Sequence, residues 1–517
     1  MRISKPAVIL ATAVFVLSLA VMVGAAGSAL GRPANHHNLA NQRHNLATQV
    51  LLGGNVYTMD PAHPRATAVA FRDGRILAVG TDKDMRRYIS PHFTEVRDVH
   101  GLVITPGFID PHMHLRQGLV TGAAYVRMGV TTITTGPCGG SDEDIAKFIA
   151  DTNATGFAPN VLTYIGAGTL RAAVGVPDEY TAATPAQIGQ MVALADQAMK
   201  DGAIGVSYGI EYEPGTSYEE IVALARVAAA HKGHISAHIR YPTPTGSMLY
   251  AVDEIMQAGK DAGCPVHISH LVPMVYGEMP ESLAAIAAAR ADGQDVTADT
   301  YPYDAWATGI KTATFDDPSI WDFTYSDIEV VTGPYAGQYL TEELFNYLRS
   351  LPEDTTVAVH SIPWDDAIMA YQSPFVMVGS DGSFRYDSSI DAYQGHPRGA
   401  GTYPRVLGKL VREDGILTFE QALFKMTVMP AVRLQLYRKG MLKPGLDADI
   451  VVFDKDTIID TATFGNNACY TPPIGIDSVY VNWRLTVKGQ EYLGTMAGKA
   501  LAHKEIPTLP VPMTPGQ

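Results

Sequence analysis

Eight short apolar runs alternate with helix-like stretches between Leu102 and Asp381, and this alternation constrains the fold more than any other feature. Strands separated by helices form a parallel sheet, because each connection has to cross back over the sheet before the next strand begins. No Gly-x-Gly-x-x-Gly phosphate-binding turn follows the first run, so these units predict a closed α/β barrel of the (β/α)8 TIM type rather than an open sheet. The predicted strands are Leu102–Asp110, Thr131–Thr135, Val161–Gly166, Ala203–Tyr208, His234–His238, Val266–His270, Asp295–Thr300 and Phe375–Ser380.

Local signals predict where some helices begin and end. Ser217 with Glu220, and Thr418 with Gln421, have the spacing of a capping box at a helix start. Gly233 is placed to end the first of these helices, because glycine commonly follows the last helical turn. The segment 306–371, before the eighth strand, is longer than a normal connection in a barrel and is rich in Trp and Tyr. It predicts an inserted sub-domain or a lid over the pocket.

Strand-like sequence near both ends of the chain predicts a second, smaller domain. Two apolar runs flank Asp73-Gly74, a dipeptide typical of a tight β-hairpin turn. Further strand-like runs occur at Ile450–Phe453 and Tyr480–Val487. We therefore expect a small β-sandwich formed by residues 49–104 and 436–500, with the barrel over residues 105–435 between its two parts.

The two ends of the chain are expected to lie outside both domains. Residues 1–30 combine a basic start with an uncharged apolar run, the layout of an export signal peptide or, if it is not cleaved, of an N-terminal anchor. Residues 31–48 are typical of a polar linker, and residues 501–517 of a Pro-rich tail. This interpretation predicts a secreted or cell-envelope protein.

Charge and cysteine content limit the classes of partner. The formal net charge of −15 disfavours nucleic acid and anionic membrane surfaces as partners. Three cysteines, at positions 138, 264 and 469, are too few and too widely spaced for a disulfide framework. A cysteine that lies near metal-binding side chains would therefore need a chemical explanation.

Residues that bind metals recur at the predicted strand ends. His112 and His114 lie two residues apart just past the first strand, and side chains at i and i+2 of an extended backbone point to the same face. Neutral imidazole is a common ligand of zinc-like cations, and the carboxyl ends of barrel strands line one pocket. The residues expected there are His112 and His114 after strand one, Cys138 after strand two, His238 after strand five, His270 after strand six and Asp381 after strand eight.

Each of these residues alone has an ordinary explanation as a small buried thiol, a hydrogen-bonded histidine or a turn aspartate. Six such coincidences on one barrel face are less plausible than one metal centre. The spacing then predicts metal-assisted hydrolysis of a C–N or C–O bond, in which a cation lowers the pKa of its bound water toward about 7. Asp381 could transfer the proton, and a phenol from the Tyr301–Tyr303 stretch could help to hold the oxyanion.

Several motifs resemble those of known enzymes. The Pro106–His114 sequence, Pro-Gly-Phe-Ile-Asp-Pro-His-Met-His, resembles the signature of the amidohydrolase superfamily. Other stretches are similar to those of the N-acyl-D-amino-acid deacylase (D-aminoacylase) family, and together they cover most of the chain. They are Gly129–Gly139, Gly202–Tyr212, Asp299–Tyr303, Gly379–Gly382, His396–Gly408, Leu442–Gly445 and Ala448–Asp454.

The resemblance implies zinc as the cofactor and assigns roles to the site residues. A tight zinc site would use Cys138, His238 and His270. A second, weaker site would use His112, His114, Cys138 and Asp381.

The resemblance also implies how the substrate is held. Asp381 would be the catalytic acid and base, Tyr301 would match the tyrosine on the carbonyl side, and Arg398 would grip the substrate carboxylate. The family usually has a lysine two residues after the strand-six histidine, where this chain has Val272. This departure puts the strength of carboxylate recognition, and the substrate class, in doubt.

These implications give one main prediction and two alternatives. The main prediction is zinc-dependent hydrolysis of the amide bond of N-acyl-D-amino acids, small molecules that a metal-activated water attacks with an Asp as acid and base. The first alternative keeps the metal site but acts on a dipeptide, a cyclic amide or a lactone. The second is a non-catalytic extracytoplasmic barrel that binds a ligand, which would require an incomplete site, whereas every ligand position is filled.

Overall fold

The computed structural model describes residues 46–115 and 118–503. The predicted export signal or anchor, most of the predicted linker and nearly all of the predicted Pro-rich tail lie outside these residues. Within the described ranges, no helix is both long enough and apolar enough to cross a membrane.

Within the described residues, eight parallel strands form the barrel, which confirms the predicted fold class. Neighbouring strands follow chain order in two sheets, β8-β9-β10 and β11-β12-β13-β14-β15-β19. The short strands β10 and β11 are two parts of one strand interrupted at Tyr164, and a bridge between Met113 and Gly382 joins the last strand to the first. The bounds are β8 Phe108–Asp110, β9 Val130–Thr135, β10 Asn160–Thr163, β11 Ile165–Gly166, β12 Gly205–Gly209, β13 His234–His238, β14 Val266–Ile268, β15 Val296–Thr300 and β19 Val376–Val378.

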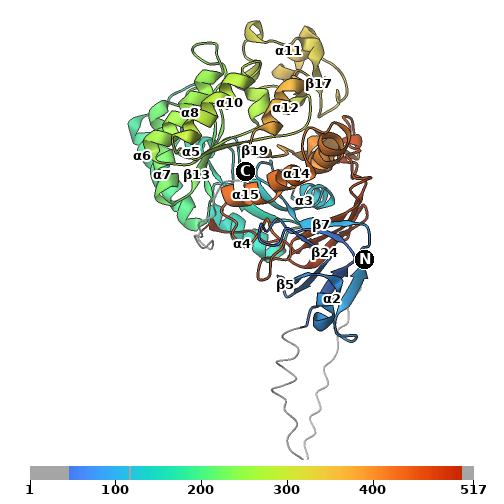
Figure 1. Ribbon diagram of the computed structural model, residues 1–517. Coiled ribbons are helices and arrows are strands. Elements are labelled where there is room, and N and C mark those ends of the chain that lie inside the picture. Colours follow the sequence, from blue (N-terminus) through green and yellow to red (C-terminus); the bar gives the residue numbers. More distant parts are fainter. Residues whose placement is uncertain (1–45, 116–117, 504–517) are drawn as a thin grey trace, which may run out of the picture. The chain divides into compact units, whose positions relative to one another are not determined.

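Helices cover the outside of these strands, and α6, α7 and α8 lie side by side in green in Figure 1. Their apolar faces pack on the strands, so the strands are buried on both faces, as expected of a parallel barrel. The helices are α3 Gly118–Arg127, α4 Ile145–Thr155, α5 Ala167–Ala173, α6 Pro185–Asp201, α7 Tyr218–Ala230, α8 Leu249–Ala262, α9 Leu271–Met274, α10 Met279–Ala291, α12 Trp364–Gln372, α13 Arg398–Arg405, the π-helix η5 Val406–Glu413, α14 Phe419–Met426 and α15 Val428–Arg433.

Both ends of the described chain contribute to a β-sandwich of two sheets, ordered β5-β4-β1-β6 and β25-β24-β23-β22-β7-β2-β3. In the second sheet β7, which precedes the barrel, pairs with β22, which follows it. The hairpin predicted at Asp73-Gly74 is present, and both residues have positive φ, 49° and 83°. The elements are β1 Gln49–Leu52, β2 Asn55–Tyr57, β3 Arg65–Ala66, β4 Ala68–Arg72, β5 Arg75–Gly80, α2 Asp82–Met85, η1 Arg86–Tyr88, β6 Glu95–Asp98, β7 Val103–Pro106, β22 Ile450–Phe453, η6 Ala468–Tyr470, β23 Ile476–Val481, β24 Arg484–Lys488 and β25 Glu491–Tyr492.

The single strand predicted at Leu102–Asp110 is wrong, because the structure divides it between the two domains. The first half, β7, belongs to the sandwich, and the second half, β8, begins the barrel. Gly107 separates them, and a Cβ at this position would lie 2.1 Å from Thr131 Oγ1 on β9. Only glycine permits this close approach, which brings the chain from one sheet into the other.

The two predicted helix starts differ in outcome. Thr418 and Gln421 form the full capping box. Ser217 accepts from the backbone N–H of Glu220, but the buried Glu220 carboxylate pairs with Arg171, 2.7 Å away, instead of returning a bond to Ser217. The left-handed residue after that helix is Lys232, with φ of 60°, rather than Gly233.

The predicted insertion has its own core but is shorter than residues 306–371. A three-stranded sheet, ordered β16-β18-β17, packs with α11 around a separate set of apolar side chains. The later helix α12 contacts β15 and β19 and is therefore the barrel's own helix. In Figure 1, α11 and β17 lie beyond the ends of α10 and α12. The bounds are β16 Trp306–Gly309, η2 Ala313–Phe315, η3 Pro318–Ile320, η4 Tyr325–Asp327, β17 Ile328–Val330, α11 Glu342–Ser350 and β18 Thr356–Val359, and a hairpin of β20 Phe384–Asp387 and β21 Ala392–Gly395 follows the eighth barrel strand.

One buried lysine gives the fold a testable pH dependence. Lys425 donates to the carbonyl oxygens of Ser373 and Val376 at 2.6 and 2.7 Å, and burial lowers its pKa to about 7. Between that value and the unfolded value of about 10.4, the unfolded chain holds the extra proton, so stability rises with pH by up to about 1.4 kcal/mol per unit. Below the folded pKa both states are protonated and this contribution no longer changes.

We therefore expect the Lys425→Met variant to lose this rise in stability between pH 7.5 and 9.5, as measured by chemical unfolding at each pH. Lys260→Met, at an exposed lysine, serves as the matched control and should keep the wild-type slope. Parallel slopes for wild type and Lys425→Met would contradict the lowered pKa.

Candidate metal centre

The strand ends bring the predicted site residues to one face of the barrel. His112 and His114 follow β8, Cys138 follows β9, and His238 ends β13. His270, Tyr301 and Asp381 follow β14, β15 and β19, and Arg398 begins α13. All except His114 are at most 9 % exposed. The carboxyl ends of the strands therefore supply every predicted side chain except that of Arg398, as in a (β/α)8 barrel with a functional site.

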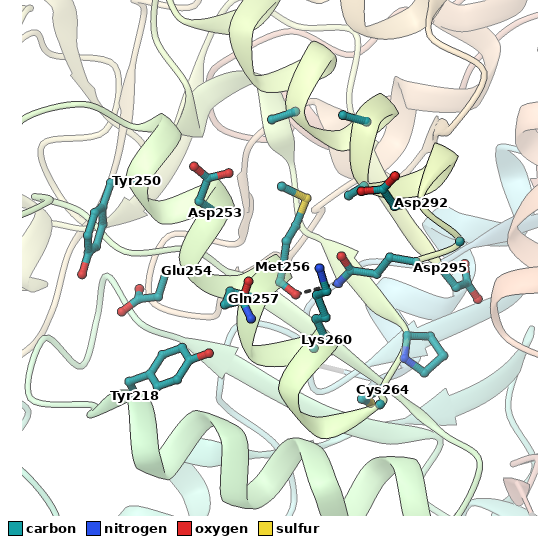
Figure 2. Close-up of a pocket in the computed structure, with 18 residues that line it drawn as sticks. Tyr218, Tyr250, Asp253, Glu254, Met256, Gln257, Lys260, Cys264, Asp292 and Asp295 are labelled. Carbon is teal, nitrogen blue, oxygen red and sulfur yellow. Dashed lines mark hydrogen bonds between the residues drawn. The ribbon is translucent and has the colours of Figure 1, made fainter.

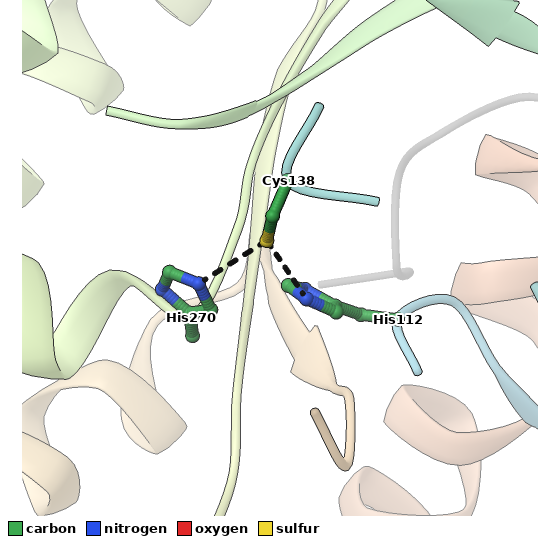
Figure 3. A group of neighbouring side chains, drawn as sticks. All are labelled: His112, Cys138 and His270. Atoms are coloured by element: carbon green, nitrogen blue, oxygen red, sulfur yellow. Dashed lines mark hydrogen bonds between the residues drawn. The ribbon is translucent and has the colours of Figure 1, made fainter. Parts of the chain in front are cut away.

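The thiol of Cys138 lies between two imidazoles (Figure 3). Its Sγ is 3.5 Å from His112 Nε2 and 3.6 Å from His270 Nε2. Zinc bonds of about 2.3 Å to sulfur and about 2.0 Å to nitrogen place two tetrahedral ligands roughly 3.6 Å apart. These three side chains therefore have the spacing of ligands that share one cation, and in this group His112 stands where the resemblance implies His238.

A second group of metal-ligand atoms adjoins the first. Asp381 Oδ1 is 3.0 Å from His114 Nε2 and 3.4 Å from His112 Nε2. The other carboxylate oxygen, Oδ2, is 2.9 Å from a terminal nitrogen of Arg398. His112 belongs to both groups, so the two clusters form one continuous polar centre.

His238 is oriented by a carboxylate that the sequence analysis missed. Its Nε2 is hydrogen-bonded to Glu211, which is 5 % exposed, and its ring centroid is 4.5 Å from that of His270. Although burial disfavours the charged ring, Glu211 raises the pKa of His238 to about 9. Nδ1 of His238 has no hydrogen-bond partner among the described residues, so it is the nitrogen that can bind a cation, which would displace its proton. A carboxylate that holds the far nitrogen of a ligand histidine is a common arrangement in metal sites.

Asp299 was also missed as a site residue, although it lies in the Asp-Thr-Tyr-Pro-Tyr motif. Its Oδ2 is 3.1 Å from His112 Nδ1, and its Oδ1 accepts the backbone N–H of His270 at 2.9 Å. Burial alone would raise the pKa of Asp299, but His112 and His267 hold it below its usual range. Because the Asp299 carboxylate holds Nδ1 of His112, the other ring nitrogen, Nε2, faces the Cys138 thiol.

Three site residues have a backbone conformation that L-amino acids rarely adopt. The φ angles of Cys138, His270 and Asp381 are 54°, 31° and 49°. Strained residues of this kind persist where the surrounding structure fixes them, and they cluster at functional sites. In this conformation all three side chains point to the same centre. No sequence pattern predicts a positive φ at non-glycine positions such as these.

The charges at the centre favour metal binding. Burial would raise the pKa of the Cys138 thiol, but His112 and its neighbours hold it well below its usual range, which favours the anionic form. Burial would likewise raise the pKa of Asp381, but Arg398 and the two nearby histidines hold it well below its usual range. An anionic thiol, imidazoles and a carboxylate are the donors that zinc prefers.

Arg398 and Tyr301 present unused donors beside the centre. Within the described residues, Nε and one terminal nitrogen of Arg398, and the hydroxyl of Tyr301, have no hydrogen-bond partner although they are buried. The guanidinium lies over the Tyr301 ring, 4.5 Å from its centroid. Buried donors normally have a partner, so these groups point to an anionic ligand.

Two pockets open on the centre and differ in chemistry. The first has mostly apolar and aromatic walls, formed by Tyr212, Tyr241, Met248, Pro273, Met274, Tyr276, Tyr301, Trp306 and Phe323 together with His238 and His270. The second, of about 340 Å³, is polar and is lined by His114, Arg385, Arg398 and several threonines. Val272, 1 % exposed, lines neither pocket and packs in the barrel core.

A larger hollow of about 990 Å³ lies elsewhere, between α8 and α10 on the outside of the barrel (Figure 2). It shares no lining residue with the two pockets, and its wall combines small side chains with Asp253, Glu254, Asp292, Asp295 and Lys260. Gln294 bridges the two helices there by donating to the carbonyl oxygen of Met256 at 2.6 Å. This hollow is not the candidate active site, because no described metal-ligand group lies in it.

Comparison with known proteins agrees with this geometry. Residues 103–482 match the model of the amidohydrolase family. D-aminoacylase of Alcaligenes xylosoxydans xylosoxydans is 34 % identical over 88 % of this chain and 97 % of its own. A D-aminoacylase structure, studied for the role of its binuclear metal centre, matches with a TM-score of 0.77 at 31 % identity, over 88 % of this chain and 100 % of that one. The zinc- and phosphonate-bound structure of N-acyl-D-glutamate deacylase from Bordetella bronchiseptica matches with a TM-score of 0.74 at 28 % identity, over 88 % and 100 % of the two chains.

Proposed function

Because this chain belongs to the amidohydrolase family and is a hydrolase of C–N amide bonds, we propose that it is a zinc enzyme that deacylates N-acyl-D-amino acids. The proposal takes its substrate from the relatives, since one is a D-aminoacylase and another an N-acyl-D-glutamate deacylase. The observation that carries it is the buried Arg398, whose unused donors lie beside the metal-ligand cluster.

In this proposal the metal is held by residues with suitable donor atoms. Cys138, His238 and His270 form the tight site, and His112, His114 and Asp381 add a weaker one that shares the thiol. The spacing of 3.6 Å between Sγ and His270 Nε2 and the free Nδ1 of His238 support the tight site. The spacing of 3.5 Å between Sγ and His112 Nε2 supports a thiol shared with the weaker site. When bound, zinc polarises the amide carbonyl and lowers the pKa of water toward about 7.

The chain's own groups then position the substrate and move the proton. Arg398 binds the α-carboxylate, and the Tyr301 hydroxyl donates to the developing oxyanion. The ionised Asp381 carboxylate accepts a proton from the attacking water and delivers it to the leaving nitrogen. Arg398 also pairs with Asp381, so one guanidinium would hold both the substrate and the acid–base group in register.

The two pockets suggest which amino acids are preferred. The pocket with aromatic and methionine walls has no lysine or arginine among its lining residues, and it includes the carboxylates of Glu211, Asp322 and Asp381. An acidic side chain placed there would be repelled and left without a partner. The substrate side chain is therefore apolar or aromatic rather than acidic.

A panel of N-acetyl amino acids tests the proposal. We expect kcat/KM for N-acetyl-D-methionine or N-acetyl-D-leucine to exceed that for the L-enantiomers and for N-acetyl-D-glutamate by about 10²-fold or more. In the Arg398→Met variant, the preference for a substrate with a free carboxylate over its carboxamide should disappear, mainly through KM. Hydrolysis confined to dipeptides, cyclic amides or lactones would overturn the proposal.

A further inference from the structure

A line of polar side chains runs through the barrel interior toward the metal centre. Asp295, Thr297 and Asp299 alternate along β15 and its start, and residues at this spacing point to the same side of a strand. Asp295 is exposed at the wall of the outer hollow (Figure 2), whereas Thr297 and Asp299 are at most 2 % exposed. The line thus begins at the solvent-exposed start of the strand, with Asp295, and ends with Asp299 beside the metal centre.

Arg433 and His267 connect these residues by hydrogen bonds. Arg433 pairs with Asp295 at 2.6 Å and donates from Nε to Thr297 Oγ1 at 2.8 Å. Thr297 Oγ1 is 2.9 Å from Nδ1 of His267, whose Nε2 is 2.7 Å from Asp299 Oδ2. The same carboxylate oxygen then bonds the ring of His112, so the sequence of contacts ends on a predicted metal ligand.

The donor and acceptor roles along this series of hydrogen bonds follow from the groups at its two ends, the Asp299 carboxylate and the Arg433 guanidinium. A carboxylate accepts only, so both ring nitrogens that face Asp299 carry hydrogen. Nε of Arg433 donates only, which leaves the Thr297 hydroxyl hydrogen free for His267 Nδ1. The positive guanidinium on the same hydroxyl disfavours a second positive charge on His267, so this ring is neutral with its hydrogen on Nε2.

We propose that His267 is a positioning residue of the metal centre: with Thr297 and Arg433 it fixes Asp299, and so keeps the Nδ1–H of His112 on Asp299 and its Nε2 lone pair toward Cys138. The second hydrogen bond of a ligand histidine sets its tautomer and its basicity. Here the carboxylate that makes this bond, Asp299, is itself held by a series of hydrogen bonds that extends to the other end of the barrel strand. The inference rests on the metal centre of the proposed function.

The affinity for the second, more weakly held zinc, which uses His112 in the proposed function, tests the inference without reference to activity. It is measured on the full-length enzyme by competition with a chromogenic chelator. Thr297→Val keeps the side-chain shape but removes the hydroxyl, and we expect a 10- to 100-fold weaker affinity. Thr297→Ser restores the hydroxyl and should restore the affinity. Thr132→Val is the matched control, because Thr132 is a fully buried barrel threonine whose hydroxyl has no partner among the described residues.

A second pair of variants addresses His267 directly. Glutamine can accept from Thr297 and donate to Asp299, so His267→Gln should bind zinc within about 3-fold of wild type, whereas His267→Leu should lose 10- to 100-fold. Equal affinities of wild type and Thr297→Val, or equal losses in Thr297→Val and Thr132→Val, would overturn the positioning role. A wild-type protein that binds no zinc would instead contradict the proposed function itself, so failure of the positioning role and failure of the proposed function are distinguishable.

Discussion

Cys138→Ser is expected to weaken zinc binding by more than 10²-fold and to abolish amide hydrolysis. The thiol lies 3.5 and 3.6 Å from the ring nitrogens of His112 and His270, and the surrounding histidines hold it as an anion despite its burial. A serine hydroxyl occupies nearly the same volume but stays protonated, so the centre loses its soft anionic ligand. Metal content after dialysis and affinity by chelator competition measure the loss.

Cys264 provides the control for this substitution. It is also a buried free cysteine, but it lies by the outer hollow, where burial raises the pKa of its thiol to about 12. Cys264→Ser should keep both metal content and activity, with at most a small loss of stability. A Cys138→Ser enzyme that retains zinc with wild-type affinity would show that the thiol is not a ligand.

The fold and most of the site residues could be predicted from the sequence, because both depend on local patterns. Short apolar runs mark parallel strands, and strand ends share one face of a barrel, so a predicted ligand such as His270 could be placed without knowing any contact. The prediction erred where tertiary packing overrides a local signal. The approach of Gly107 to Thr131 divides one apolar run between two domains, and neither residue signals this alone.

Glu211 and Asp299 were missed for a different reason. Each holds one ring nitrogen of a predicted ligand histidine, and which nitrogen it holds depends on the ring orientation. A carboxylate inside an apolar strand, such as Asp299 in β15, or just after one, such as Glu211 after β12, is a detectable signal, since an unpaired buried charge is costly and therefore has a partner. The sequence shows that a partner must exist, but the fold alone identifies it as a histidine of the candidate metal centre.

Asp381→Ala is expected to lower kcat by about 10² to 10⁴-fold, the range for loss of a general acid and base. The carboxylate spans the centre, with one oxygen near His112 and His114 and the other on Arg398. Its removal eliminates the acceptor for the proton of the attacking water and the donor to the leaving nitrogen. Zinc affinity at the Cys138 side should change much less, because that group of ligands stays complete.

Two controls separate proton transfer from damage to the site. Asp381→Asn keeps the shape and a hydrogen-bond acceptor for Arg398 but does not titrate, so its kcat should fall nearly as far as that of the alanine variant. Asp391→Ala removes an exposed aspartate with nearly the same backbone angle, φ of 50° against 49°, and should keep kcat within about 2-fold of wild type. Substantial activity of Asp381→Ala with a filled metal site would exclude this carboxylate as the acid–base group, and the free donors of Arg398 would then bind substrate beside a different proton carrier.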